Sequence, residues 1–288
     1  MSKRLDVMKT YKLYIGGKFP RSESGYTMPI TSASGEHLAH VAQASRKDAR
    51  DAVSAARSAQ TGWAGATAYN RGQVLYRIAE MLEGRAEQFV EEIKRSEGVT
   101  ARAAKTQVEK AIDTWVWYAG WSDKHAQIVG GANPVAGPFF NLSVPEPTGV
   151  VVAFAPAEKT GQSLLGLVET LAPIVVSGNA VVVLAHPEQP LPAMSFAEVL
   201  NSSDVPGGVV NILTGKREGM ATWLAEHADV NALDLMGATE LDWAKLEEVA
   251  AQTLKRCVTP VRGFFGASMA RITAFTELKT VWHTKALG

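Results

Sequence analysis

The second half of the chain alternates short apolar strands with helix-like segments, and this alternation restricts the possible folds more than any other feature. Strand-like runs occur at GVVVAFA, NAVVVLA, GVVNIL and VNALDLMG, between residues 149 and 237. Helix-like segments such as SLLGLVETLAPIV, PAMSFAEVL and MATWLAEHA separate these runs, and LDWAKLEEVAAQTLKR follows the last of them. Consecutive βαβ units join parallel strands by right-handed crossovers and place helices on both faces of the sheet. We therefore expect an α/β protein with a Rossmann-like, doubly wound parallel sheet.

In a sheet of this kind, ligands bind beyond the carboxyl ends of the strands. The segments that follow Phe154, Leu184, Leu213 and Leu235 are therefore the candidate functional segments. TGKREG, after the third strand, contains glycines but has no G-x-G-x-x-G spacing and does not follow the first strand. We predict that it is a plain turn.

The first half of the chain predicts short strands followed by helices. Residues 11–42 mix β-branched and aromatic residues with glycine, serine and proline, as short strands with tight turns do. Ser45 and Asp48 have the spacing of a capping box, which predicts a helix from there to about Trp63. A later helix carries an apolar stripe of Val108, Ile112, Trp115 and Ala119. The aromatic cluster WVWYAGW is expected to pack in the core.

Composition narrows the possible functions. The 288 residues include 29 basic and 29 acidic side chains, so no net charge favours nucleic acid or an acidic membrane. Nowhere do 18 apolar residues run together, and we expect a cytoplasmic protein. A single cysteine, Cys257, excludes an internal disulfide and a multi-cysteine metal site. No metal site is expected.

Several motifs occur in a fixed order along the chain: LYIGGKF, WYAGWSDK, EPTGVV, LAPIVVSGNAVVVL, VPGGVVNILTG, GATE and LKR. In order and spacing they resemble aldehyde dehydrogenases, from about Tyr11 to Gly263. AFTELKTVWH resembles the last β-strand of the same family, which belongs to its oligomerisation region. IVGGANPVAGPFFNLSVPEP resembles the hairpin of that region. Between the two stretches of resemblance, nearly the whole catalytic domain of the family is missing.

The resemblance divides the chain into four parts. Residues 1–123 correspond to the N-terminal strands and helices of the cofactor domain, which form an N-terminal helical segment. Residues 124–147 correspond to the oligomerisation hairpin, and residues 148–265 to the Rossmann-like βαβ part of the cofactor domain. Residues 266–288 correspond to the C-terminal oligomerisation strand. Hairpin and strand together are expected to form a small β oligomerisation element, because an unpaired strand promotes aggregation.

The resemblance implies that this chain lacks the family's catalytic residues. An aldehyde dehydrogenase needs a cysteine thiolate, a donor for the oxyanion and a carboxylate base. The nucleophile belongs to the missing domain, and Cys257 is expected to be a buried structural cysteine. Glu158 stands where the family has the asparagine of a Pro-Trp-Asn-Phe-Pro motif. Pro260 stands where it has the glutamate of a Leu-Glu-Leu-Gly-Gly motif, so no catalytic residue is expected.

The resemblance also implies a weakened cofactor site. The family's ribose-binding lysine and glutamate align with Leu184 and Pro187, although Glu188 lies next to the second position. In GATE, the family's Gly-Ser-Thr-Glu motif retains Gly237, Thr239 and Glu240, while Ala238 replaces the serine. We expect no cofactor, with residual NAD(P) binding at Gly237, Thr239 and Glu240 as the alternative, since a helix N-terminus attracts an anion.

Three polar residues, Glu158, Lys159 and His186, follow neighbouring strands. We expect them to form solvated surface, and new acid–base chemistry is the alternative.

A pattern with this internal gap resembles the truncated second unit of family 16 aldehyde dehydrogenases. The first hypothesis is therefore a pseudoenzyme that acts as a structural or regulatory subunit. It would form a homo-oligomer, or a hetero-oligomer with a complete aldehyde dehydrogenase, without nucleic acid or membrane. The alternatives are a nucleotide-binding module, and a non-catalytic part of an NAD-dependent oxidoreductase whose catalytic residues come in trans.

Overall fold

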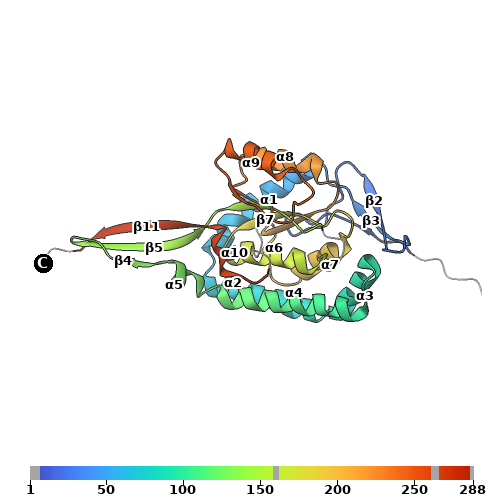
Figure 1. Cartoon of the computed structure of the whole chain (residues 1–288), viewed down its shortest axis with the longest axis horizontal. Coiled ribbons are helices and arrows are strands. Elements are labelled where there is room, and N and C mark those ends of the chain that lie inside the picture. Colours follow the sequence, from blue (N-terminus) through green and yellow to red (C-terminus); the bar gives the residue numbers. More distant parts are fainter. Residues whose placement is uncertain (1–6, 158–161, 261–265, 286–288) are drawn as a thin grey trace, which may run out of the picture.

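A five-stranded sheet forms the centre of the molecule (Figure 1). The computed structural model describes residues 7–157, 162–260 and 266–285. The strands are β6 (Val150–Phe154), β7 (Ala180–Leu184), β8 (Val210–Leu213), β9 (Ala232–Asp234) and β10 (Arg256–Val258). Their order is β10-β9-β6-β7-β8 and every pairing is parallel, which confirms the predicted Rossmann-like sheet. The order reverses between β6 and β9, the point at which such sheets bind ligands.

Helices cover both faces of the sheet, as the doubly wound fold requires. On one face lie α1 (Arg46–Gly65), α8 (Glu218–Glu226) and α9 (Trp243–Ala251). On the other lie α2 (Ala68–Glu83), α3 (Ala86–Glu97), α4 (Ala101–Trp121), α6 (Leu165–Val176) and α7 (Leu191–Asn201). Strand β6 shows why two cores form. Val150 and Val152 face the first layer, whereas Val151 and Ala153 face the second, because successive strand residues point to opposite faces.

The predicted N-terminal elements are confirmed. Strands β1 (Thr10–Tyr11), β2 (Thr27–Thr31) and β3 (His37–Ala42) form a small sheet in the order β1-β3-β2. Helix α1 begins with the predicted capping box, in which the Ser45 side chain accepts from the Asp48 N–H and the Asp48 carboxylate accepts from the Ser45 N–H. Trp115 is fully buried and stacks on Phe196 at a ring distance of 5.9 Å, as expected for core packing.

The last strand of the central sheet was not predicted from the sequence. We expected LDWAKLEEVAAQTLKR to be helical throughout, but α9 ends at Ala251 and Arg256 begins β10. The turn between them passes through Leu254, which has a φ of 54° and is 94% exposed. A leucine in this left-handed conformation is unusual, and the strand it precedes has only three residues. Because of both features, the pattern of apolar residues does not predict this strand.

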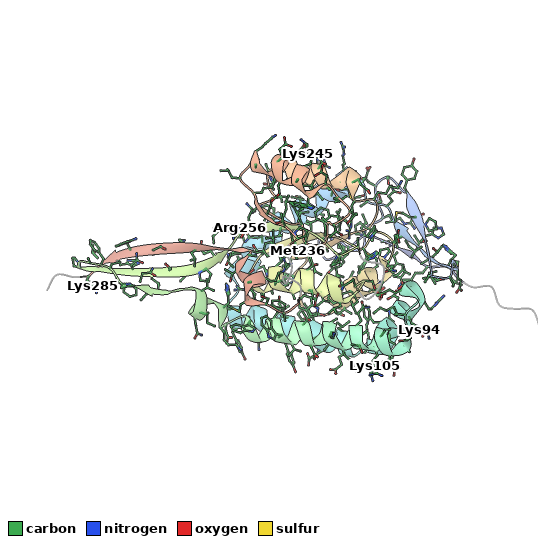
Figure 2. The ribbon with its side chains drawn as sticks, viewed as in Figure 1. Lys94, Lys105, Met236, Lys245, Arg256 and Lys285 are labelled. Atoms are coloured by element: carbon green, nitrogen blue, oxygen red, sulfur yellow. The ribbon has the colours of Figure 1, made fainter. Side chains whose placement is uncertain are left out.

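A three-stranded antiparallel arm projects from the body of the molecule (Figure 1). It contains β4 (Gly131–Asn133), β5 (Phe139–Pro147) and β11 (Thr276–Thr284), in the order β11-β5-β4. Short helices α5 (His125–Val129) and α10 (Met269–Thr273) precede β4 and β11. Figure 2 shows the arm running from the neighbourhood of Arg256 to Lys285 at its far end. The hairpin therefore provides the predicted partner for the last strand, although the segment before Thr276 includes a helix rather than strand alone.

Candidate functional site

The candidate site is the edge of the sheet where β6, β7, β8 and β9 end. The residues that follow these strands approach one another closely. Gly237, after β9, packs so tightly that a Cβ atom built on it would lie 2.1 Å from the carbonyl oxygen of Phe154. Beside this edge, a cavity of about 310 Å³ is lined by Pro187, Glu188, Lys216, Arg217, Glu218 and Glu240, among others.

Arg217 fills the crevice between the strand ends. It precedes α8, and its side chain is 1% exposed. Its guanidinium donates to the carbonyl oxygens of Ala155, Leu184, Ala185 and Gly237, which follow or end β6, β7 and β9. Arg217 was not predicted from the sequence as a site residue, since TGKREG was expected to be a plain turn.

Glu240 is a further partner of Arg217. Its carboxylate lies 2.7 Å from Nη1 of Arg217 and is about one-third exposed. Of the other residues predicted to bind a cofactor, Gly237 uses its carbonyl oxygen to accept from Arg217 at 3.2 Å, and Thr239 is exposed. The structure thus brings Gly237 and Glu240 together around an arginine side chain and leaves Thr239 on the surface.

The GATE motif does not begin a helix, contrary to our expectation. Residues 236–241 form turns, and α9 begins only at Trp243. The carboxylate of Asp242 caps this helix by accepting from the Lys245 N–H at 3.1 Å. A negatively charged side chain therefore already occupies the anion-attracting end of the helix. Residual phosphate binding was expected because a helix N-terminus attracts an anion, and GATE does not stand at such an end here.

The start of α6, the helix that follows β6, is capped by side chains of two other helices. Glu97, at the end of α3, is buried and accepts from the N–H of Ser163 at 3.1 Å. Gln107 of α4 accepts from the N–H groups of Leu164 and Leu165 at 2.9 and 3.2 Å. These N–H groups at the start of α6 are therefore satisfied by protein side chains, as buried helix ends require. Among the described residues, the carbonyl oxygens in the crevice and the capped helix starts offer few donors to a phosphate.

We expected His186 to form solvated surface, but the structure buries it. It is 2% exposed, and its Nδ1 accepts from the N–H groups of Glu188 and Gln189 at 3.1 and 3.0 Å. The imidazole therefore holds the turn after β7. Leu184 is buried, whereas Glu188 is exposed at the cavity. Glu158 and Lys159, predicted to lie nearby, fall outside the described residues.

Cys257 lies in β10, at one edge of the central sheet, and Pro260 follows this strand. Pro260, in the loop after β10, has no group that accepts a proton. Cys257 is in β10 and is half-buried beside the α8–α9 layer, so it is less buried than the predicted buried structural cysteine. Burial, followed by the nearby Glu247 carboxylate, raises the pKa of the Cys257 thiol to about 11.

We expect alkylation of Cys257 by iodoacetamide to be slow at neutral pH. Because the thiolate is the reactive form, the rate should rise about tenfold per pH unit from pH 7 towards the raised pKa. Mass spectrometry of the intact chain measures this rate, with free cysteine as the control. Rapid alkylation at pH 7 that levels off near pH 9 would contradict the assignment of Cys257 as a structural residue.

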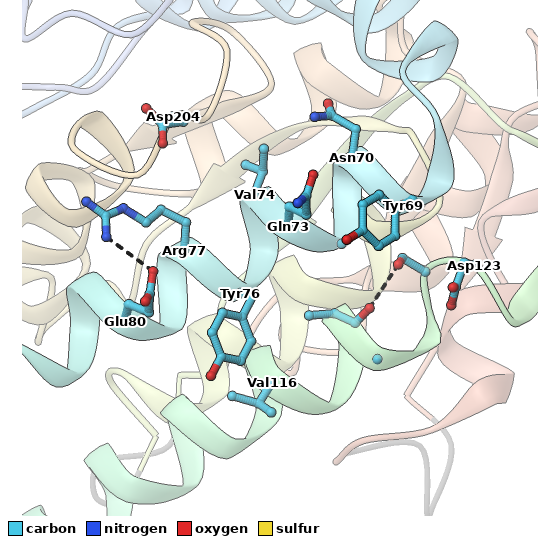
Figure 3. Close-up of a pocket in the computed structure, with 14 residues that line it drawn as sticks. Tyr69, Asn70, Gln73, Val74, Tyr76, Arg77, Glu80, Val116, Asp123 and Asp204 are labelled. Carbon is cyan, nitrogen blue, oxygen red and sulfur yellow. Dashed lines mark hydrogen bonds and ion pairs between the residues drawn. The ribbon is translucent and has the colours of Figure 1, made fainter.

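A wider groove lies on the helical layer, away from the strand ends (Figure 3). It has a volume of about 810 Å³ and runs between α2 and α4, where Tyr76 and Val116 are exposed. Arg77 and Glu80, which line it, pair with each other at 3.2 Å.

In the described parts of the chain, no cluster of three or more His, Cys, Asp or Glu side chains has the arrangement of a metal site. Within the same parts, no helix is long and apolar enough to cross a membrane.

The sequence profile of the "Aldehyde dehydrogenase family" matches residues 20–263. The putative aldehyde dehydrogenase DhaS of Bacillus subtilis (strain 168) is 30% identical over 91% of this chain and 53% of its own length. The cytosolic 10-formyltetrahydrofolate dehydrogenase of Mus musculus is 33% identical over 88% of this chain and 28% of its own length. Among solved structures, HpcC of Thermus thermophilus has a TM-score of 0.80 and 28% identity, over 87% of this chain and 48% of that one.

The chain thus spans about half the length, or less, of the relatives it matches. The profile ends at residue 263, and β11 begins only at Thr276. Since the profile covers most of the chain and the fold agrees with that of a solved relative, the chain belongs to the aldehyde dehydrogenase family.

Proposed function

We propose that this protein is a non-catalytic member of the family that acts as a structural or regulatory subunit. It assembles with itself or with a complete aldehyde dehydrogenase, and it does so through the arm of β4, β5 and β11. The observation that carries this proposal is the arm itself, a sheet that exposes apolar side chains and has no layer of described residues packed against it. Both the fold and the position of the arm support assembly as the retained role.

The arm is a poor structure for an isolated monomer. Leu278 and Trp282 are 57% and 59% exposed on one face of β11, and Phe140 of β5 is 45% exposed on the other. A small antiparallel sheet needs a hydrophobic face buried against another layer to be stable. β11 also lies at the edge of the arm, with an unpaired row of backbone groups in the described structure. A second subunit that covers Leu278 and Trp282 and pairs with the edge of β11 buries the apolar side chains and satisfies the unpaired backbone groups.

The crevice supports the non-catalytic half of the proposal. Arg217 occupies the place where a dinucleotide binds in sheets of this topology, and the helix ends nearby are capped by protein side chains. Pro260 stands at the position of the family's base. No cofactor is proposed, and the alternative of a nucleotide-binding module is correspondingly less well supported. The name of the cytosolic mouse relative supports a cytoplasmic location.

A turnover assay tests the non-catalytic role. We expect the purified chain to produce no NADH from NAD and a panel of aliphatic and aromatic aldehydes, and its melting temperature to stay unchanged when NAD is added. A complete aldehyde dehydrogenase serves as the positive control. NADH accumulation at a rate proportional to the concentration of this chain would contradict the proposal.

A further inference from the structure

The acceptors around Arg217 form a complete set for one guanidinium group. Nε donates to the carbonyl oxygen of Ala185 at 3.1 Å, and Nη1 donates to Gly237 at 3.2 Å and to Glu240 at 2.7 Å. Nη2 donates to the carbonyl oxygens of Ala155, Leu184 and Ala185. A guanidinium has five N–H donors in a planar fork, and each of its nitrogens here has at least as many acceptors as hydrogens. Such a match between a planar donor and converging oxygens is typical of a binding site.

The position of Arg217 breaks a local rule. It stands immediately before α8, where the positive end of the helix dipole disfavours a cation. Its own carbonyl oxygen accepts from Ala221 at 2.8 Å, so the residue belongs to the start of that helix. A residue that violates the local preference is expected to have a compensating interaction elsewhere. The oxygens of the crevice provide that interaction.

The chemistry of the crevice is selective for cations. Its described lining around the guanidinium consists of backbone carbonyl oxygens and the Glu240 carboxylate, which present negative charge. Glu188 and Glu218 line the adjoining cavity of about 310 Å³, with Lys216 as a basic neighbour. A phosphate would face these oxygens with few donors among the described residues, whereas a planar cation satisfies them.

We propose that the crevice at the carboxyl ends of β6, β7 and β9 is a guanidinium site whose resident ligand is Arg217. In this chain, the place of a dinucleotide is taken by a side chain that ties three strand ends together. When the Arg217 side chain is removed, the crevice accepts a planar cation with several hydrogen-bond donors and does not accept a nucleotide phosphate. The inference goes beyond the assembly role and does not depend on it.

Chemical rescue tests the proposal. Arg217→Ala should lower the melting temperature by about 5 °C or more, because several buried carbonyl oxygens lose their donor. Methylguanidinium at millimolar concentration should restore part of that loss, while methylammonium, AMP and NAD should not. Lys216→Ala is the matched control from the same loop, and we expect neither a loss nor a rescue. Wild-type protein should not be stabilised by methylguanidinium.

A second variant covers the case in which Arg217→Ala does not fold. Arg217→Lys keeps the charge and most of the length but loses the planar fork, so its melting temperature should fall nearly as far. An unchanged melting temperature in Arg217→Lys would overturn the proposal. Stabilisation of Arg217→Ala by NAD or AMP, and not by methylguanidinium, would also overturn it, since the crevice would then remain a nucleotide site that Arg217 merely blocks.

Discussion

Replacing Arg271 by methionine should lower the free energy of unfolding by about 3–5 kcal/mol, because it leaves the Asp234 carboxylate buried without its partner. Arg271 is in α10 and Asp234 ends β9, and both side chains are almost completely buried. Burial alone would lower the pKa of Arg271, but the Asp234 carboxylate raises it above its ordinary value, so the guanidinium stays charged. Urea unfolding followed by circular dichroism measures the change.

Two further variants make this experiment specific. Asp234→Asn combined with Arg271→Met removes both charges while the amide oxygen still accepts from the Met236 N–H, as the carboxylate does at 3.2 Å. We expect this double variant to recover part of the loss. Lys245→Ala removes an exposed ion pair with Glu248 and should leave the urea midpoint unchanged, because solvent screens such a pair. If Arg271→Met were as stable as wild type, the pair would not hold α10 to the sheet.

The buried pair matters because it joins the arm to the body. Phe275, which follows α10, is fully buried, and its carbonyl oxygen accepts from the Thr148 N–H at 3.1 Å. Arg256 of β10 donates to the carbonyl oxygens of Ala274 and Thr276, at 3.1 and 2.6 Å. These contacts fix the base of β11 directly to the central sheet. A rigid base lets the arm present one defined surface to another subunit.

Replacing both Leu278 and Trp282 by aspartate should abolish assembly. The two side chains lie on the same face of β11, because residues four apart on a strand point the same way. If the two side chains are central to the interface and contribute about 2 kcal/mol each, their loss removes about 4 kcal/mol and should weaken association by about 700-fold. Light scattering measures the mass over a range of protein concentrations.

His283→Ala is the matched control for the arm. His283 is exposed on the opposite face of the same strand, and its replacement should leave the mass unchanged. Circular dichroism should show that all three proteins keep their secondary structure. A Leu278→Asp, Trp282→Asp variant that keeps the mass of the wild type would show that this face is not the contact.

The regular elements were predictable because they depend on local periodicity. The continuous apolar runs of β6, β7 and β8 signalled strands covered on both faces, and the Ser45–Asp48 spacing signalled the start of α1. β10 escaped prediction, since its three residues are too few for a pattern and the turn before it uses Leu254 in a left-handed conformation. Short strands are set by their neighbours more than by their own sequence.

The environment of Arg217 was not predictable from a motif. Apart from the Glu240 carboxylate, the acceptors described above are backbone carbonyl oxygens of residues 20 to 62 positions away, and backbone acceptors have no sequence signature. The one available signal was a basic residue at the start of an expected helix, where the dipole disfavours it. In contrast, the pairing of the hairpin with the last strand followed from resemblance, because both segments match one region of the same family.

The mass of the natively purified complex, with its subunits identified, tests the central claim most directly. We expect a mass above the 30.8 kDa of one chain, from copies of this chain alone or together with a complete aldehyde dehydrogenase, and we expect this larger assembly to be lost in the Leu278→Asp, Trp282→Asp variant. A wild-type protein that remains a single 30.8 kDa chain at every concentration, with no second subunit, would contradict it.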